Sequence, residues 1–222
     1  MIKSYEILNK IEKKENISTA FNESFNMLII GKPGSGKSTI LQELLMNEEL
    51  LKAQFTHIFI FSPTKMDFID MKEGKNWYKD FSLDKLFEII DLINNTNLTT
   101  SITPKKVLFI FDDLIGAMHK ERDSPQFVNL LFNRRHLIKN GCLSFIIITQ
   151  RYLSVPINLR CCLTIILFFK LTAKDYKLLK EDLIGYLDFK KLATHIMNDY
   201  DFLFVNLENS LIYKNFIEKI II

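Results

Sequence analysis

The sequence predicts an α/β fold: a mostly parallel, twisted sheet with helices on both faces. Three observations predict it. Apolar, strand-like segments alternate with helix-compatible segments along the 222 residues, two of the apolar segments are hydrophobic throughout, and a glycine-rich turn joins the first apolar segment to a helix. Continuous hydrophobicity is typical of strands covered on both faces, as in parallel sheets. Strands that alternate with helices then run parallel, joined by right-handed crossovers.

Each expected element has a local signal. The expected strands are residues 26–31, 55–62, 106–112, 143–149, 163–169 and 201–207, with a short strand or tail at 211–222. The expected helices are residues 39–52, 83–94, 124–139 and 173–183, and a second short helix at 188–198. Pro125 and Gly141 flank the third of these helices, and Thr172 caps the fourth.

The remaining segments complete one expected domain over residues 1–222. Residues 1–22 are expected to form a peripheral arm, residues 65–80 to be irregular, and residues 170–222 to be a C-terminal extension of the same domain.

Composition limits the class of protein without identifying a partner. Hydrophobic residues make up 48% and charged residues 25% of the chain, as in an ordinary soluble domain. The formal net charge, 29 − 26 = +3, is too small to indicate a polyanionic partner by itself. Cys142, Cys161 and Cys162 lack the count of a disulfide framework and the spacing of a zinc site, which favours a reducing, intracellular environment. No signal peptide is expected, and the longest apolar run, residues 161–169, is too short to span a bilayer.

The segment between the first strand and the first helix matches the phosphate-loop pattern G-x-x-x-x-G-K-[ST] at every fixed position. Its glycines allow backbone N–H groups to surround an anion at the N-terminus of the helix. We expect Lys37 to reach the β- and γ-phosphates and the Ser38 hydroxyl to bind Mg²⁺. The expected nucleotide-binding residues are Gly31, Lys32, Pro33, Gly34, Ser35, Gly36, Lys37, Ser38 and Thr39.

Two acidic residues, Asp112 and Asp113, end the third expected strand. Ligands of open α/β sheets bind outside the carboxyl ends of the strands, so the pair is expected beside a bound triphosphate. We expect Asp112 to hold Mg²⁺, directly or through water, and Asp113 to act as the general base toward the attacking water. The alternative is a pair of helix-capping aspartates.

Gln150 follows the fourth expected strand at the same edge of the sheet. Its carboxamide would sense the γ-phosphate and orient the water without becoming charged. The alternative is a polar residue at a strand edge, and Thr149 is a weaker candidate for the same role. Trp77, the single tryptophan, is expected to pack in the interior rather than to stack on a nucleotide base.

The available cations are Arg134, Arg135, Arg151 and Arg160. Hydrolysis of a triphosphate spreads charge over the γ-oxygens, and an arginine of the same or of a neighbouring subunit can neutralise it. The alternative for each arginine is a solvated surface residue.

These motifs resemble the FtsK/HerA-like packaging ATPases of large DNA viruses and their smaller relatives. The resemblance covers residues 25–165. Its segments, in order, are residues 31–39, 57–63 and 108–113, then Arg135-His136-Leu137, Ile148-Thr149-Gln150, and Val155-Pro156 with Arg160. The phosphate loop is found in many families. Two segments point to this one: Arg-His-Leu, and Gln followed by Val-Pro and then Arg.

The resemblance implies a RecA-like P-loop fold in which the fourth strand lies between the Walker A strand, which enters the phosphate loop, and the Walker B strand, which ends in the acidic pair. It also implies Mg²⁺-dependent hydrolysis of ATP to ADP and phosphate by a homo-oligomeric ring. The ring would pump double-stranded DNA, without sequence specificity, into a preformed capsid. By position, Arg135 and Arg160 join Lys37, Asp113 and Gln150 as catalytic candidates, for charge neutralisation or for subunit coupling.

The implied partners are proteins of the capsid vertex or an inner membrane, and the implied place is the host cytoplasm at the site of viral assembly, or the virion. Within the motor class, the sequence does not separate packaging from a helicase or recombination motor.

Two other classes of protein remain as alternatives. A small-molecule P-loop kinase would need an arginine-rich lid, but residues 170–191 are lysine-rich and contain no arginine. A non-catalytic ATP-binding assembly protein is disfavoured by the intact Lys37, Ser38, Asp112 and Asp113.

Overall fold

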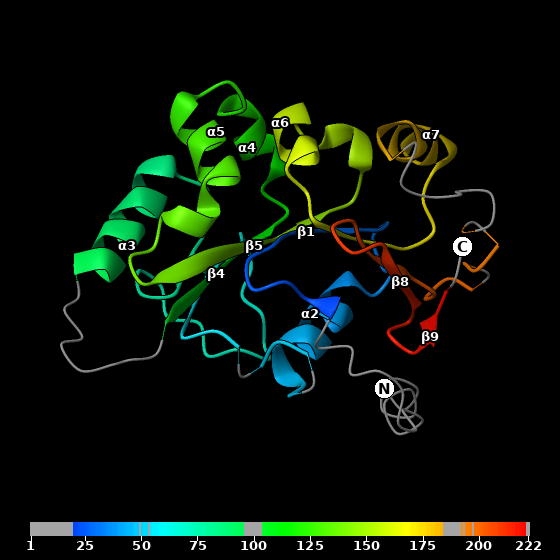
Figure 1. Cartoon of the computed structure of the whole chain (residues 1–222), viewed down its shortest axis with the longest axis horizontal. Helices are drawn as coiled ribbons and strands as arrows, with labels where there is room; N and C mark the ends of the chain where they lie inside the picture. Colours follow the sequence, from blue (N-terminus) through cyan, green and yellow to red (C-terminus); the bar gives the residue numbers. More distant parts are fainter. Residues whose placement is uncertain are drawn as a thin grey trace.

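Nine strands form one sheet through the centre of the molecule (Figure 1). The computed structural model describes residues 20–220 except 49, 53, 96–103, 184–191, 193 and 197. The strands are β1 (Asn26–Ile30), β2 (His57–Phe61), β3 (Trp77–Tyr78), β4 (Lys105–Asp112), β5 (Gly141–Thr149), β6 (Ile165–Phe168), β7 (Leu203–Asn206), β8 (Leu211–Lys214) and β9 (Glu218–Lys219). The helices are α2 (Lys37–Met46), α3 (Leu83–Asn95), α4 (Ile115–Lys120), α5 (Pro125–Phe132), α6 (Ile157–Cys161) and α7 (Ala173–Asp182), with 3-10 turns η2 (Arg134–His136) and η3 (Tyr152–Ser154).

The strand order is β3-β2-β4-β5-β1-β6-β7-β8-β9, and the strands from β3 to β6 are parallel. β5 lies between β1 and β4, where Ile148 stands opposite both Ile29 and Asp112. The carboxyl ends of these three strands therefore meet at one edge of the sheet. This confirms the α/β fold and the position of the fourth expected strand between the Walker A and Walker B strands.

The C-terminal strands extend the same sheet in the opposite direction. β7 is antiparallel to β6, with Leu203 opposite Phe168, so the chain enters β7 at the edge where β6 ends. β8 and β9 continue the antiparallel pairing. The outermost strands of the sheet, β3 and β9, have two residues each.

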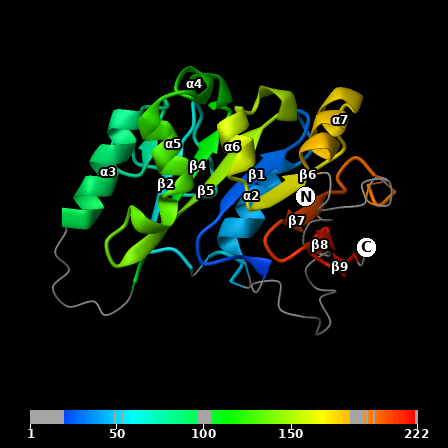
Figure 2. The same cartoon turned by 45° about the horizontal axis from the view of Figure 1, so that its top comes forward.

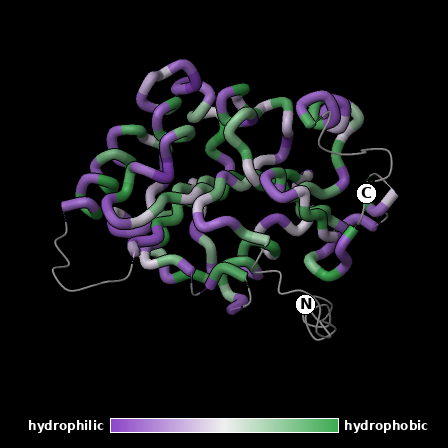
Figure 3. The backbone as a smooth tube through the Cα atoms, in the orientation of Figure 1, coloured by the Kyte–Doolittle hydropathy of each residue, from purple (hydrophilic) through white to green (hydrophobic). Residues whose placement is uncertain are grey.

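Helices cover the two faces of the sheet unequally (Figures 1 and 2). On one face α3 to α7 pack over a core that includes Leu28 and Ile30 of β1. On the other face α2 packs over a core that includes Met27 and Ile29. Successive residues of β1 are thus buried on opposite faces, which explains the unbroken hydrophobicity of the strand. Hydrophobic residues gather along the sheet in Figure 3, whereas the outer turns are hydrophilic.

Helix boundaries are where the structure departs from the sequence prediction. The helix expected over residues 124–139 ends at Phe132, because the chain turns into η2 and buries the Arg134 side chain. The helix expected over residues 39–52 ends at Met46, and its last residues form a turn in which the Leu51 N–H donates to the Leu44 carbonyl (3.0 Å). The short helices α4 and α6 and the strand β3 were not predicted.

Parts of two predictions lie outside the described residues. These are residues 1–19 of the expected N-terminal arm and most of the short helix expected over residues 188–198. The described end of the arm is not peripheral, since Ala20 and Phe21 are buried in the core beneath α2. No helix within the described part of the chain is long and apolar enough to cross a membrane.

Candidate functional site

The loop between β1 and α2 has three glycines at positions that disfavour a side chain, two because of their backbone and one because of its neighbours. Gly34 and Gly36 have φ angles of 77° and 99°, in the left-handed region that disfavours side chains. A Cβ on Gly31 would collide with the Ser35 hydroxyl and lie 2.8 Å from the Phe169 ring. The Ser35 Oγ is buried and has no hydrogen-bond partner among the described residues. A glycine-rich loop that leads into a helix N-terminus and carries an unsatisfied hydroxyl suits a phosphate group.

Lys37, the first residue of α2, folds back over this loop. Its ammonium donates to the carbonyl oxygens of Gly31 (2.7 Å) and Lys32 (2.8 Å). Burial lowers the pKa of Lys37, and the negative charges of Asp112 and Asp113 oppose that shift. The side chain is therefore partly desolvated, and it would gain from an additional anion.

The acidic pair lies at the end of β4, beside the loop. Burial raises the pKa of the Asp112 carboxyl, as does the charge of Asp113, and Lys37 acts in the opposite direction. Asp113 has a φ of 56°, and its N–H donates to the Ile148 carbonyl of β5 (3.3 Å). A non-glycine residue in the left-handed region costs energy that is commonly tolerated at functional sites. Asp112 is thus a carboxylate in need of a cation, and Asp113 is exposed to solvent next to it.

A cavity of about 200 Å³ brings the candidate residues together. Its lining comprises Lys37, Thr64, Asp112, Asp113, Ile148, Thr149 and Gln150. These residues come from the phosphate loop and from the carboxyl ends of β2, β4 and β5. The described residues contain no group of three His, Cys, Asp or Glu side chains that could hold a metal ion. Of the two predicted Mg²⁺ ligands, Asp112 lines the cavity, whereas Ser38 is exposed and is not among its lining residues.

Gln150 is exposed at the end of β5, and the turn behind it is held by α7. The buried carboxylate of Asp175 accepts from the Leu153 N–H (3.0 Å) and from the Thr172 hydroxyl (2.5 Å). Arg151 Nε lies 3.9 Å from the same carboxylate. Thr172 caps α7 as predicted, because its hydroxyl accepts from the Asp175 N–H (3.2 Å).

Sequence reasoning missed Asp175 and Thr64. The spacing Thr172-x-x-Asp175 is a capping-box pattern, and it could have revealed the aspartate as part of a helix start. Thr64 carried a weaker signal, as a hydroxyl residue just beyond the end of a strand.

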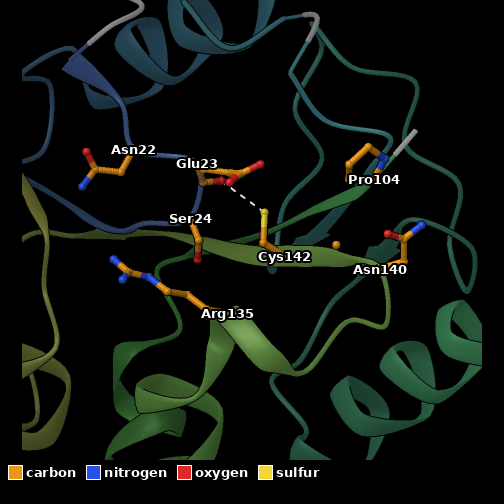
Figure 4. Close-up of a pocket in the computed structure, with 8 residues that line it drawn as sticks. Asn22, Glu23, Ser24, Pro104, Arg135, Asn140 and Cys142 are labelled. Carbon is orange, nitrogen blue, oxygen red and sulfur yellow. Dashed lines mark hydrogen bonds between the residues drawn. The ribbon is translucent and has the colours of Figure 1, made fainter. Parts of the chain in front are cut away.

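The structure does not bring Arg135 to this cavity. Arg135 lies at the opposite edge of the sheet, where it pairs with Glu208 (2.8 Å) and lines a larger cavity of about 480 Å³ (Figure 4). Glu23 and Cys142 line the same cavity, and the Cys142 thiol donates to the Glu23 carbonyl (3.2 Å). β5 has nine residues, so its two ends lie roughly 26 Å apart. Arg135 therefore cannot neutralise charge at the phosphate loop of its own subunit.

Arg160 is also outside the cavity. Its guanidinium pairs with Asp182 of α7 and lies over the Tyr152 ring (5.5 Å to the ring centre). The Tyr152 hydroxyl donates to the same carboxylate (2.8 Å), and the Arg160 side chain is only 15% exposed. Within the chain, Arg160 therefore holds α6 against α7.

Two further candidates have packing positions. Trp77 is 4% exposed, and its indole N–H donates to the Ser62 carbonyl (2.9 Å), which confirms the packing role expected for it. Arg134 is buried, and burial lowers the pKa of its guanidinium.

Comparison with known proteins gives a family match and several structural likenesses. The family model described as Poxvirus A32 protein matches residues 12–199. A search of curated proteins gave no match.

Among solved structures, the genome packaging NTPase B204 of Sulfolobus turreted icosahedral virus 2, in complex with AMPPCP, is similar with a TM-score of 0.66 and 18% identity over 90% of this chain and 100% of that chain. The complex of B204 with sulfate is similar with a TM-score of 0.65 and 17% identity, over 87% of this chain and 96% of that chain. The conjugation coupling protein TcpA of pCW3, as a monomer with ATPγS, is similar with a TM-score of 0.53 and 18% identity. The match covers 86% of this chain and 59% of that chain. At these identities the likeness establishes the fold.

Proposed function

Because the chain belongs to the family of poxvirus A32 proteins, we propose that it is an ATPase that drives double-stranded viral DNA into a preformed capsid. The observation that carries this proposal is the cavity in which Lys37, Asp112, Asp113 and Gln150 meet beside the phosphate loop. Support for ATP comes from the similarly folded packaging NTPase, which has been solved in complex with ATPγS and with AMPPCP.

Binding follows from the loop described above. Backbone N–H groups of the loop would surround the phosphates, and the Lys37 ammonium would exchange the carbonyls of Gly31 and Lys32 for β- and γ-phosphate oxygens. The Ser38 hydroxyl and the Asp112 carboxylate would hold Mg²⁺. When bound, this ion neutralises charge on the phosphate oxygens. Burial and the charge of Asp113 raise the pKa of Asp112, so its carboxylate form is unfavourable on its own. A bound Mg²⁺ would stabilise that carboxylate.

Hydrolysis needs a water molecule placed in line with the γ-phosphate. Asp113 would accept a proton from that water as it attacks, and the Gln150 carboxamide would orient it without taking a charge. Lys37 stabilises the charge that grows on the γ-oxygens. The products are ADP and phosphate.

An arginine is absent from the described lining of the cavity. We therefore assign the missing positive charge to a neighbouring subunit of a homo-oligomeric ring, with Arg135 as the candidate, since this side chain cannot act on its own phosphate loop. Arg160 is the weaker candidate because Asp182 and Tyr152 already hold it.

The DNA would be gripped through its phosphates by basic side chains, without reading of the bases. Proteins of the capsid vertex or of an inner membrane are the proposed partners, at the site of viral assembly in the host cytoplasm or in the virion.

The decisive experiment measures ATP hydrolysis with and without duplex DNA, together with the sedimentation of the full chain in the presence of ATP and Mg²⁺. We expect turnover that duplex DNA stimulates and a particle of ring size. Lys37→Ala should abolish turnover, and Asp113→Asn should lower single-turnover hydrolysis while leaving ATP binding intact. A monomer whose hydrolysis ignores DNA would exclude the motor.

Asp113→Asn is the sharper of the two variants, because asparagine tolerates the left-handed backbone at this position. Full activity in this variant would remove Asp113 from the role of base. Strand-separation activity on duplex DNA would favour the helicase alternative over packaging.

A further inference from the structure

The phosphate loop divides the carboxyl edge of the sheet into two sides. Asp112 ends β4 and Gln150 follows β5, and both strands lie on one side of β1. β6 and β7 lie on the other side. A triphosphate whose γ-phosphate lies toward Asp112 and Gln150 must therefore direct its nucleoside toward β6 and β7.

An exposed aromatic residue, Tyr200, lies on this second side. The chain enters β7 at Leu203, opposite the last residue of β6, so Tyr200 is at the same edge as the phosphate loop. A Cβ on Gly36 would lie 3.8 Å from Cδ1 of Tyr200 and 3.8 Å from Cε1 of Phe169. Phe169 is 1% exposed, whereas Tyr200 is 72% exposed. Phe169 therefore supports the loop from within, and Tyr200 offers its ring to solvent beside it.

The turn that carries Tyr200 is fixed by its neighbour, Asp201. The Asp201 carboxylate accepts from the N–H (3.1 Å) and the side-chain amide (3.2 Å) of Asn198, and from the amide of Asn215 (3.0 Å). Lys214 Nζ lies 3.2 Å from the same carboxylate. The backbone beneath the exposed ring is thus held in place, so a ligand that contacts the ring would not have to order the turn.

We propose that Tyr200 is the surface on which the adenine ring of the bound nucleotide stacks, an inference that rests on the ATP binding proposed above. Aromatic rings stack face to face with an offset, and nucleobases have a large π face. Stacking tolerates any base, so Tyr200 contributes affinity for the nucleoside end rather than selection of adenine over guanine. The stacking role also explains why a large aromatic side chain is exposed beside a polar loop.

The test compares ligands that share the phosphates and differ in the base. Binding of ATP, GTP and inorganic tripolyphosphate, each with Mg²⁺, is measured by calorimetry on the full chain. Tyr200→Ala should weaken ATP and GTP binding roughly 5- to 100-fold and leave tripolyphosphate binding unchanged. Tyr200→Phe should bind all three ligands like the original chain. Phe132→Ala, which removes an exposed aromatic side chain on α5, is the matched control and should change nothing.

Two results would overturn the stacking role of Tyr200, and a different result would overturn the proposed function. Unchanged ATP affinity in Tyr200→Ala, with ATP binding lost in Lys37→Ala, would overturn the stacking role alone. An equal loss for ATP and tripolyphosphate would also overturn it, because the ring would then act on the phosphate loop. ATP binding that Lys37→Ala does not affect would overturn the proposed function itself.

Discussion

Asp112 stands where its own charge is unfavourable, and this has a consequence for stability. Burial and the neighbouring Asp113 hold the pKa of Asp112 above its ordinary value. Between the ordinary pKa of an aspartate and the raised pKa of Asp112, the folded chain binds a proton more readily than the unfolded chain. Folding therefore gains stability as pH falls through the raised pKa and loses it as pH rises. At neutral pH the carboxylate reduces stability in order to be available for a cation.

We expect Asp112→Asn to raise the melting temperature of the nucleotide-free protein at neutral pH, since the amide carries no charge to desolvate. The advantage should shrink as the pH is lowered, because the native carboxyl then becomes neutral too. Thermal melts across a pH series provide the measurement, with Asp113→Asn, at an exposed position, as the milder comparison. A variant that melts lower than the original chain at neutral pH would contradict the expectation.

At the scale of elements, the turn after β5 depends on the start of α7. Asp175 ties Arg151 and Leu153 to α7, and these residues lie one and three positions after Gln150. We expect Asp175→Ala to lower kcat by roughly 10- to 100-fold with little change in KM for ATP, because the water-orienting carboxamide loses its fixed position.

A double-mutant cycle with Gln150→Ala tests this coupling. If Asp175 acts through Gln150, its removal should cost almost no further activity once the glutamine is gone. Leu179→Val, at a buried position of the same helix, should lower stability without this dependence. Independent, multiplying losses from Asp175 and Gln150 would refute the positioning role.

The pairing of Arg160 with Asp182 joins α6 to α7, and we expect it to contribute to the stability of the fold. Arg160→Ala should lower the free energy of unfolding by about 1–3 kcal/mol, because it leaves the carboxylate and the Tyr152 hydroxyl without their cation. Hydrolysis per folded molecule should stay near the original value. Chemical denaturation and ATPase rates measured well below the melting temperature would check both. Lost activity at unchanged stability would instead place Arg160 at a neighbouring nucleotide.

At the scale of the whole molecule, the catalytic role proposed for Arg135 requires a second subunit, because this side chain is separated from the phosphate loop of its own chain. We expect Arg135→Ala to lower DNA-stimulated hydrolysis roughly 10³-fold. Mixing it with Lys37→Ala should restore part of the activity, since one variant supplies the loop and the other supplies the arginine.

The control for this mixing experiment is the double variant carrying both substitutions, which should rescue neither partner. Glu208→Gln removes the ion-pair partner of Arg135 and should leave the activity of the assembly largely intact. Recovery with the double variant would show that the arginine is not the component supplied in trans.

The α/β fold and the meeting of Asp112 with Lys37 could be predicted, because continuous apolar strands and a fixed loop pattern are local signals. The place of β5 between β1 and β4 was predicted only through the resemblance to packaging ATPases. The break of the expected helix at Asn133 could not be predicted, since it depends on burial of Arg134 by distant segments. Asp175 and Tyr200 were missed for a related reason: strand pairing and packing, not sequence spacing, bring them to the carboxyl edge.

The two-residue strands at the margins of the sheet set limits on how copies of this protein can join. β3 and β9 expose so little unpaired backbone that a neighbouring chain gains almost no hydrogen-bonded ladder by docking against either one. In the proposed ring, contacts between the described parts of neighbouring copies would then rely on side chains of helices and loops. Such contacts can slide and re-form, which a continuous intermolecular sheet would prevent. The geometry that discourages fibre formation would therefore also leave each copy in the proposed ring free to shift against the next.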